Sequence, residues 1–448
     1  MPLAESNAGG PAKDFHIDLN PYFSGLMPSP TLAVNERVAE LRREGRTVYH
    51  LGFGESRFPV HSRLAAALQQ HSMAKSYLAA QGLPELRETV ARYYTTQLRQ
   101  PFGADQVIVG PGSKALIFAV QMAMSADLFL PSPSWVSYEP QAQMLGKRVS
   151  YIPSRVENDH ALDLDALDAL LAGSSTPQRL LILNSPNNPT GMMLDEASLQ
   201  ALAGFCRERN VVVLSDEIYF RVRQDREHHS IARYYPEGTI ILGGLSKHLS
   251  IGGWRLGVAL VPDHDAGRRL LGAMTAIASE IWSAVASPVQ HAAVIAYAGD
   301  PDIEDYTATC SAVHALRTRF LRDGLITVGI RCTPAEGAFY LTANFDRWRT
   351  ALAERGVKTS QDLAEYLIEE FSIATLPCSV FGLPPETLSL RLASSYLDME
   401  SDDDGSRVLN AYQANPATLM SEQHHPRFHA CIAAFGAFIA SLEGTAGS

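Results

Sequence analysis

Short apolar runs alternate with amphipathic helical patterns along most of the chain, between about residues 60 and 300. This order predicts a mostly parallel sheet with helices on both faces, and therefore an α/β fold. The predicted strands are residues 107–109, 180–183, 211–214, 239–242 and 256–261. Sheets of this kind bind ligands beyond the carboxyl ends of their strands, so the residues that directly follow these runs are the first candidates for function.

The composition argues against several classes of protein. A formal net charge of −11 argues against a nucleic-acid partner. No apolar run reaches the ~18 residues of a membrane helix, and residues 1–15 lack the apolar core of a signal peptide. The five cysteines form no CxxC pair and no cluster with histidine at zinc spacing. We therefore expect reduced thiols, no metal, no membrane and a cytoplasmic location.

A length of 448 residues is enough for two or three domains. Residues 1–30 are rich in Pro, Gly and Ser and predict an arm, and the apolar spacing of 31–44 predicts a helix that Gly45 ends. The expected division is an arm and part of a small domain in residues 1–60, a large domain in 61–304, and the remainder of the small domain in 305–448.

The last third of the chain has a different pattern. Residues 339–341 and 388–392 predict strands, and the acidic, glycine-containing residues 398–406 predict a loop. Residues 402–426 form a long polar segment whose role the sequence leaves open.

The segment 244–257, GLSKHLSIGGWRLG, carries the most specific chemistry. Ser246 and Lys247 follow the predicted strand 239–242, and Arg255 lies eight residues after the lysine. A lysine that burial deprotonates becomes a nucleophilic amine, whereas a hydroxyl and a guanidinium suit a phosphate. The combination indicates an imine with a phosphorylated aldehyde. A lysine on an exposed loop is the plainer alternative.

Polar side chains also follow the two preceding strands. Asn188 lies in NSPNNPTG, after the strand 180–183, and Asp216 and Tyr219 lie in SDEIYF, after 211–214. An aspartate at the end of a buried strand needs a cation or several donors. The alternatives are a proline-rich turn, an aspartate that caps the strand and a tyrosine of the core.

The segment VIVGPGSKALIFA at 107–119 predicts a strand, a glycine turn at Gly112 and a helix. The backbone N–H groups of Ser113 and Lys114 would open that helix and form an anion site. Trp135, in PSPSWVSY, either stacks on a flat ring or belongs to the core. Arg391, in SLRLASSY, either pairs with a carboxylate through its planar fork or lies exposed on a strand.

Four of these elements occur in an order that resembles the class I and II aminotransferase family of fold-type I pyridoxal phosphate enzymes. They are the NPTG string, the SDEIY string, the Ser246-Lys247 to WRLG segment and Arg391, and the resemblance covers roughly residues 30–400. It implies a mostly parallel seven-stranded sheet, with helices on both faces, in a large domain that binds pyridoxal 5'-phosphate. A smaller α+β domain would complete the chain.

The resemblance also implies roles for single residues. Lys247 would hold the cofactor as a Schiff base and then move the Cα proton. Asp216 would face the ring nitrogen, Asn188 and Tyr219 would bind the phenolic oxygen, and Trp135 would stack on the ring. The implied phosphate ligands are Gly112, Ser113, Lys114, Ser246, Arg255 and, from a neighbouring subunit, Tyr77. The implied substrate ligands are Gly54, Asn188, Arg391 for the α-carboxylate and, as in one prokaryotic aspartate aminotransferase subgroup, Lys114 for a distal carboxylate.

We therefore expect an aminotransferase that moves an amino group between an L-amino acid and a 2-oxo acid, acting as a homodimer with shared active sites. The alternative is a lyase or replacement enzyme of a specialised biosynthetic pathway, which eliminates at Cβ or Cγ or closes a ring. His248 beside the lysine and residues 402–426 motivate that alternative. So does Arg57, because the family usually has Gly-Glu-Pro-Asp where this chain has Gly54, Glu55, Ser56 and Arg57.

Overall fold

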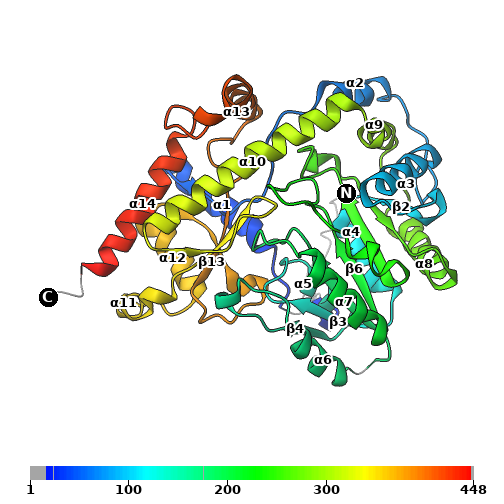
Figure 1. Ribbon diagram of the computed structural model, residues 1–448, viewed down its shortest axis with the longest axis horizontal. Coiled ribbons are helices and arrows are strands. Elements are labelled where there is room, and N and C mark those ends of the chain that lie inside the picture. The colour runs from blue at the N-terminus through cyan, green and yellow to red at the C-terminus, as the bar shows by residue number, and fades with distance from the viewer. Residues whose placement is uncertain (1–16, 24, 175, 445–448) are drawn as a thin grey trace, which may run out of the picture.

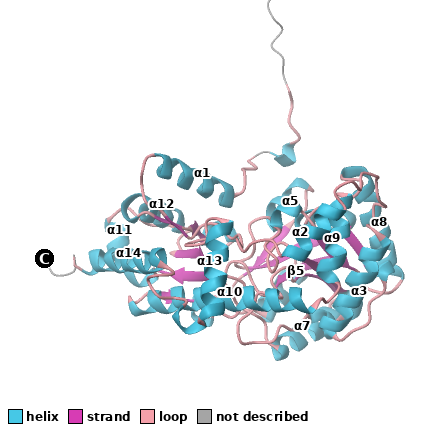
Figure 2. Ribbon diagram, turned by 90° about the horizontal axis from the view of Figure 1, so that it is seen from above, coloured by secondary structure: helices cyan, strands magenta, loops and turns pink. Residues whose placement is uncertain are grey.

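The computed structural model of the chain describes residues 17–23, 25–174 and 176–444. Much of the expected arm, residues 1–16 and 24, lies outside these described residues. Figure 1 shows a large sheet with its helices on one side of the molecule and a smaller body containing β13, α12 and α14 on the other. The long helix α10 (Pro301–Thr327) crosses between them, and Figure 2 shows the same division from above.

The large sheet has seven strands in the order β2-β8-β7-β6-β5-β3-β4. All neighbouring strands run parallel except β8, which is antiparallel to both β2 and β7. The strands are β2 (Val107–Gly110), β3 (Asp127–Pro131), β4 (Val149–Ile152), β5 (Arg179–Asn184), β6 (Val211–Asp216), β7 (Thr239–Gly244) and β8 (Gly257–Leu260). The predicted mostly parallel, seven-stranded α/β fold is confirmed.

Both faces of this sheet are buried, which explains why its strands are apolar runs rather than alternating ones. In β5, Leu180 and Ile182 contribute to one hydrophobic cluster with α4 and α8, whereas Leu181 and Leu183 contribute to another with α6 and α7. The helices of this body are α2 (Ser62–Gln70), α3 (Pro84–Leu98), α4 (Ser113–Ala123), α5 (Tyr138–Met144), α6 (Leu164–Ala172), α7 (Glu196–Glu208), α8 (Asp265–Ile281) and α9 (Ser287–Tyr297).

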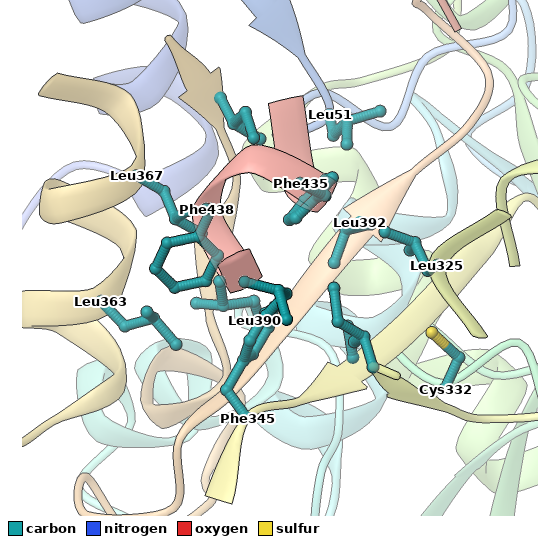
Figure 3. Packing of buried hydrophobic residues seen from close by; sticks show 14 of the residues in the cluster. Leu51, Leu325, Cys332, Phe345, Leu363, Leu367, Leu390, Leu392, Phe435 and Phe438 are labelled. Carbon is teal, nitrogen blue, oxygen red and sulfur yellow. The ribbon is translucent and has the colours of Figure 1, made fainter. Parts of the chain in front are cut away.

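The smaller body is built on a four-stranded antiparallel sheet in the order β12-β13-β10-β9. Its core includes Phe345, Leu390, Leu392, Phe435 and Phe438, which converge in Figure 3. Its elements are α10, β9 (Arg331–Cys332), β10 (Tyr340–Asn344), α11 (Arg349–Glu354), α12 (Ser360–Phe371), β12 (Leu376–Pro377), β13 (Ser389–Ala393), α13 (Asp402–Ala414) and α14 (Pro426–Glu443).

The start of the chain joins this smaller body. The predicted helix at 31–44 is confirmed as α1 (Pro30–Arg43), and β1 (Tyr49–His50) pairs in parallel with β11 (Ile373–Ala374). The expected boundary between residues 304 and 305 lies inside α10, which starts at Pro301. None of the helices in the described part of the chain is both long and apolar enough to cross a membrane.

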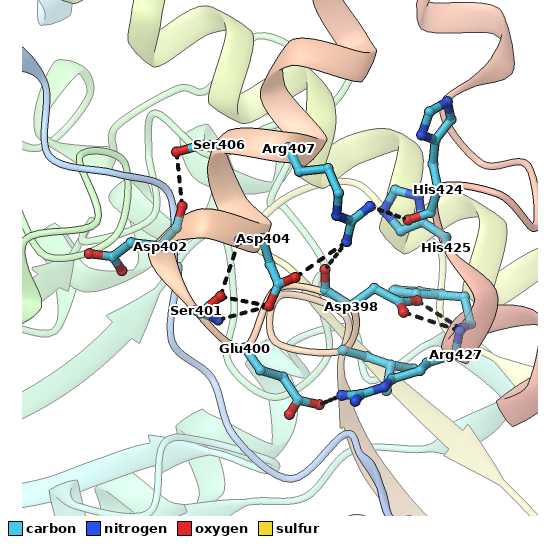
Figure 4. A network of polar contacts seen from close by, with 12 residues as sticks. Asp398, Glu400, Ser401, Asp402, Asp404, Ser406, Arg407, His424, His425 and Arg427 are labelled. Carbon is cyan, nitrogen blue, oxygen red and sulfur yellow. Dashed lines mark hydrogen bonds and ion pairs between the residues drawn. The ribbon is translucent and has the colours of Figure 1, made fainter.

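The predicted loop at residues 398–406 is wrong in its second half, because α13 starts at Asp402. Ser401 and Asp404 form a capping box at its start, with the Ser401 Oγ accepting from the Asp404 N–H at 3.1 Å. The acidic residues that suggested a loop are instead favourable beside the positive end of the helix dipole. Residues 402–426 therefore include a helix. Arg407 connects this helix to its surroundings by donating to the backbone oxygens of Asp398 and His424, at 3.2 and 2.9 Å (Figure 4).

Candidate active site

A cavity of about 340 Å³, here called the strand-end cavity, lies beyond the carboxyl ends of β5, β6 and β7. It is at the edge where parallel strands place their ligands. The structure brings eleven of the predicted site residues to its walls: Gly54, Ser113, Lys114, Trp135, Asn188, Asp216, Tyr219, Ser246, Lys247, Arg255 and Arg391. Gly112 adjoins this set as the residue just before α4.

Lys247 lies three residues after the end of β7. Its Nζ donates a hydrogen bond of 2.8 Å to the backbone oxygen of Gly54 and lies over the rings of Tyr219 and Phe339, 5.6 and 5.8 Å from their centres. Burial lowers the pKa of the Lys247 amine to about 8. The neutral amine, which is the nucleophilic form, is therefore accessible near physiological pH.

Asp216 is the last residue of β6 and is buried. The Tyr138 hydroxyl donates to its Oδ2 at 2.8 Å, and the Ile218 N–H donates to its Oδ1 at 3.3 Å. Burial raises the pKa of the Asp216 carboxyl to about 6, although both hydrogen bonds act in the opposite direction. None of the described basic side chains forms an ion pair with it, so the carboxylate suits a cationic ligand atom.

Asn188 and Tyr219 present further polar atoms to the cavity. The Asn188 Oδ1 is buried and has no hydrogen-bond partner, while the backbone N–H of Asn188 donates to the Asn184 Oδ1 at 2.8 Å. The hydroxyls of Tyr219 and Tyr340 are 2.8 Å apart. A buried amide oxygen without a partner is costly, so this wall of the cavity also suits a polar ligand.

The glycine turn before α4 forms a cradle for an anion. Gly112 has a φ of +86°, and a Cβ built there would lie 2.3 Å from the Arg255 Nη2. A Cβ on Gly257 would lie 2.4 Å from the Ser113 backbone nitrogen. Because only glycine permits this approach, the guanidinium lies beside the start of α4, where backbone N–H groups are free to bind a phosphate.

Arg391, on β13, is a buried cation at the opposite wall. Its Nη2 donates to the Gly52 backbone oxygen, its Nε has no partner, and its guanidinium lies 4.9 Å from the ring centre of Tyr340. Burial lowers the pKa of the guanidinium. None of the carboxylates in the described ranges forms an ion pair with Arg391, so it can receive one from a ligand.

Lys114 is a second such cation. Its Nζ lies 5.0 Å from the ring centre of Trp135 and forms no ion pair with the described residues. Burial, followed by the charge of Arg255, lowers the pKa of the Lys114 amine. A ligand carboxylate beside the Lys114 Nζ would favour the charged amine and so act against both burial and the Arg255 charge.

The structure places three other residues that the sequence singled out, Tyr77, Arg57 and His248, away from the strand-end cavity. Tyr77 is 92% exposed. Arg57 pairs with Glu55 at 3.2 Å and donates to the Glu400 backbone oxygen at 2.9 Å, and His248 is buried beside Phe220. Neither Arg57 nor His248 lines the strand-end cavity.

Two residues of the site were not predicted from the sequence. Tyr138 holds Asp216, and Tyr340 holds Tyr219 and also lies 3.4 Å from the Gly54 oxygen. Tyr138 lies three residues after Trp135, at the start of α5, so its position in PSPSWVSY could have indicated it. Tyr340 starts β10, 121 residues beyond Tyr219, and no local pattern connects the two.

Comparisons with known proteins point to a single family. The model of the family described as "Aminotransferase class I and II" matches residues 46–403. The aspartate aminotransferase of Geobacillus stearothermophilus is 32% identical over 389 residues, covering 84% of this chain and 95% of the relative. The asparagine–oxo-acid transaminase of Streptococcus mutans is 28% identical and covers 83% of this chain and 94% of its own.

Solved structures agree with these relatives. The aspartate aminotransferase of Thermus thermophilus, determined with maleate, superposes with a TM-score of 0.77 at 25% identity, over 89% of this chain and all of the other. The aspartate aminotransferase of Rhizobium meliloti superposes with a TM-score of 0.78 at 24% identity, over 95% of this chain and 99% of the other. At this last identity the likeness establishes the fold.

Proposed function

Since the chain belongs to the class I and II aminotransferase family, whose members use pyridoxal phosphate, we propose that it transfers the amino group of a dicarboxylic L-amino acid, such as aspartate, to a 2-oxo acid. Its activity as a pyridoxal phosphate-dependent aminotransferase follows from the family. The substrate class, the residue roles and the dimer are the proposal.

The polar groups of the strand-end cavity fit the cofactor. The unpaired Asp216 carboxylate suits the protonated ring nitrogen, and the Asn188 amide and Tyr219 hydroxyl suit the phenolic oxygen. The cradle of Gly112, Ser113 and Arg255, with Ser246, suits the phosphate, and Trp135 supplies a flat face. When bound, pyridoxal phosphate supplies an aldehyde and a ring that stabilises negative charge at the substrate Cα.

Lys247 has two tasks in this assignment. Its Nζ would hold the aldehyde of the bound cofactor and, with a substrate amine in its place, would serve as the base that takes and returns the proton of the substrate Cα. The depressed pKa of the Lys247 amine, about 8, keeps a useful fraction of it neutral. The Gly54 carbonyl, 2.8 Å from the Nζ, holds the amine in place.

The observation that carries the substrate class is the charge of the cavity walls. Besides Arg255 at the phosphate cradle, two cations, Arg391 and Lys114, line the cavity without an ion pair to any described residue. Arg391 with Asn188 would hold the α-carboxylate, which leaves Lys114 for a second carboxylate. A monocarboxylic substrate would leave the Lys114 charge unpaired.

We also propose a homodimer in which Tyr77 reaches the phosphate of the neighbouring subunit. The support is its exposure of 92% in the single chain, together with the exposed Met73 nearby. Sedimentation should find two chains per particle, and Tyr77→Phe should weaken cofactor binding without dissociating them. A monomer with full activity would contradict the proposed dimer.

We also propose a cytoplasmic location. All five cysteines are buried thiols, which suits the reducing cytoplasm that the sequence led us to expect.

The experiment that tests the function mixes the purified holoenzyme with aspartate and 2-oxoglutarate. We expect oxaloacetate and glutamate in equal amounts. Release of ammonia, or of a ring-closed product, without glutamate would support the lyase or replacement alternative.

A lysine variant then tests the substrate class. Lys114→Ala should raise the KM for aspartate about 10-fold to 100-fold, the range of a lost hydrogen bond to a charged group, and should leave alanine unaffected. Lys358→Ala, at an exposed lysine outside the cavity, is the matched control. An equal effect on both substrates would remove the distal carboxylate from the role of Lys114.

A further inference from the structure

A second cavity, of about 330 Å³, adjoins the strand-end cavity and shares two wall residues with it, Tyr138 and Asn184. Its walls include residues that follow β3 and β5, and none of the proposed cofactor or substrate roles uses it. Its volume is within the range of small-molecule sites in proteins. It is therefore large enough to bind a small molecule.

Apolar side chains form about half of the walls of the second cavity. Methionine side chains, which adapt to different ligand shapes, lie among proline and branched aliphatic residues. The apolar members are Pro131, Pro133, Leu162, Ile182, Leu183, Met192, Met193 and Leu194. Such a lining favours a ligand with a mainly apolar body.

One polar group on this lining is unused. The Ser134 side chain is 3% exposed, and its Oγ has no hydrogen-bond partner, although its backbone N–H donates to the Phe381 oxygen at 2.9 Å. Buried hydroxyls in native proteins are nearly always paired. The Ser134 Oγ is therefore the point at which a ligand can make one hydrogen bond.

The charged groups of the second cavity are already occupied or neutral. Arg226 is paired with Glu336, and Asp159 is paired with Arg331 at 3.3 Å. The Asp195 carboxylate accepts from the Ser198 N–H at 2.7 Å as the cap of α7. Burial lowers the pKa of His160 to about 4. The described walls thus provide no unpaired cation for a carboxylate, in contrast to the strand-end cavity.

We propose that the second cavity binds a small, uncharged, mainly apolar molecule that carries one hydrogen-bonding group, which pairs with the Ser134 Oγ. The absence of a free cation separates this ligand from the amino acid and 2-oxo acid substrates. The ligand would touch Tyr138, whose hydroxyl donates to the Asp216 Oδ2 at 2.8 Å, and Asn184, whose amide donates to the Asp216 backbone oxygen at 2.8 Å. Occupation of the cavity is therefore coupled to the environment of the Asp216 carboxylate, and the coupling is reciprocal.

The test uses the holoenzyme and three matched probes, with binding measured by calorimetry. 2-Naphthol, which has an apolar body and one hydroxyl, should bind once per chain. 2-Naphthoate should bind at least about 10-fold more weakly, because a buried carboxylate without a cation is costly. Ser134→Ala should weaken 2-naphthol about five-fold, the effect of one hydrogen bond, and leave naphthalene unchanged. Equal binding of the two naphthyl probes in wild-type protein would overturn the proposal.

Two tryptophan variants locate the probe. Ala161 lies exposed at the rim of the second cavity, and Leu32, 54% exposed, lines the strand-end cavity. Ala161→Trp should abolish 2-naphthol binding, and Leu32→Trp should preserve it. The reverse result would place the probe in the strand-end cavity and refute the proposal. If Ala161→Trp fails to fold, Met192→Trp, at another wall position, replaces it.

Binding of 2-naphthol should also shift the visible absorption band of the cofactor, and a constant band would refute the coupling to Asp216.

Discussion

Replacing Asp216 with asparagine should stabilise the cofactor-free protein while it abolishes transamination. The carboxylate is buried with no basic partner among the described residues, and the Tyr138 hydroxyl is its closest donor. An asparagine oxygen can accept the same hydrogen bond, so the substitution removes the buried charge and little else. The reaction would lose the anion that we propose faces the ring nitrogen.

The magnitude follows from the pKa of the Asp216 carboxyl, which burial raises from 3.8 to about 6. Because one pKa unit corresponds to about 1.4 kcal/mol, the folded protein loses about 3 kcal/mol when this group must ionise. Below pH 3.8 the Asp216 carboxyl is protonated in both the folded and the unfolded protein and costs no stability. As the pH rises from 3.8 to about 6, only the unfolded protein ionises it freely, so the free energy of unfolding falls. The gain from Asp216→Asn should therefore be about 3 kcal/mol at pH 8 and about half of that at pH 5.

Urea denaturation of both cofactor-free proteins at pH 5 and pH 8 measures this gain. Asp305→Asn, at an exposed position of α10, is the control and should change the free energy of unfolding by less than about 0.5 kcal/mol. In the holoenzymes wild type should be more stable than Asp216→Asn, because the proposed ring nitrogen then gives the wild-type carboxylate a cationic partner. A variant that is less stable than wild type by the same amount at both pH values would refute the reasoning.

Three further substitutions test other parts of the structure. Lys247→Ala should remove the visible absorption band of the covalently attached cofactor, and a band that remains would contradict the attachment at this residue. Gly54→Ala should lower kcat at least about 10-fold, because a Cβ there would lie 2.1 Å from the hydroxyl of the buried Tyr340; unchanged kinetics would contradict it. Ser401→Ala removes the cap of α13 and should lower the free energy of unfolding by about 1 kcal/mol in urea titrations, with no change in KM.

Much of the site could be predicted because its residues come directly after buried strands. Asn188, Asp216 and Lys247 each lie within four residues of the end of β5, β6 or β7. The direction of these strands follows from the strand–helix alternation, so their polar ends must gather at one edge of the sheet. Arg391 needed the family resemblance, since one arginine on a strand has no local feature that marks a site.

The other residues of the site, Tyr138 and Tyr340, act through contacts with residues far away in the sequence, which no local pattern encodes. Tyr138 and Asp216 are 78 residues apart, and Tyr219 and Tyr340 are 121 apart. The helix α13 was missed for another reason, because its aspartates were interpreted by composition alone. Their position next to Ser401, ahead of the buried Val408, would have indicated the start of a helix.

The acceptor that holds the Lys247 amine belongs to the main chain, at Gly54. No substitution at position 54 can delete that oxygen, since every amino acid carries it. Mutational drift or laboratory evolution can thus exchange the surrounding side chains and change which amino acid substrate is preferred, while the hydrogen-bond acceptor of the Lys247 amine is retained.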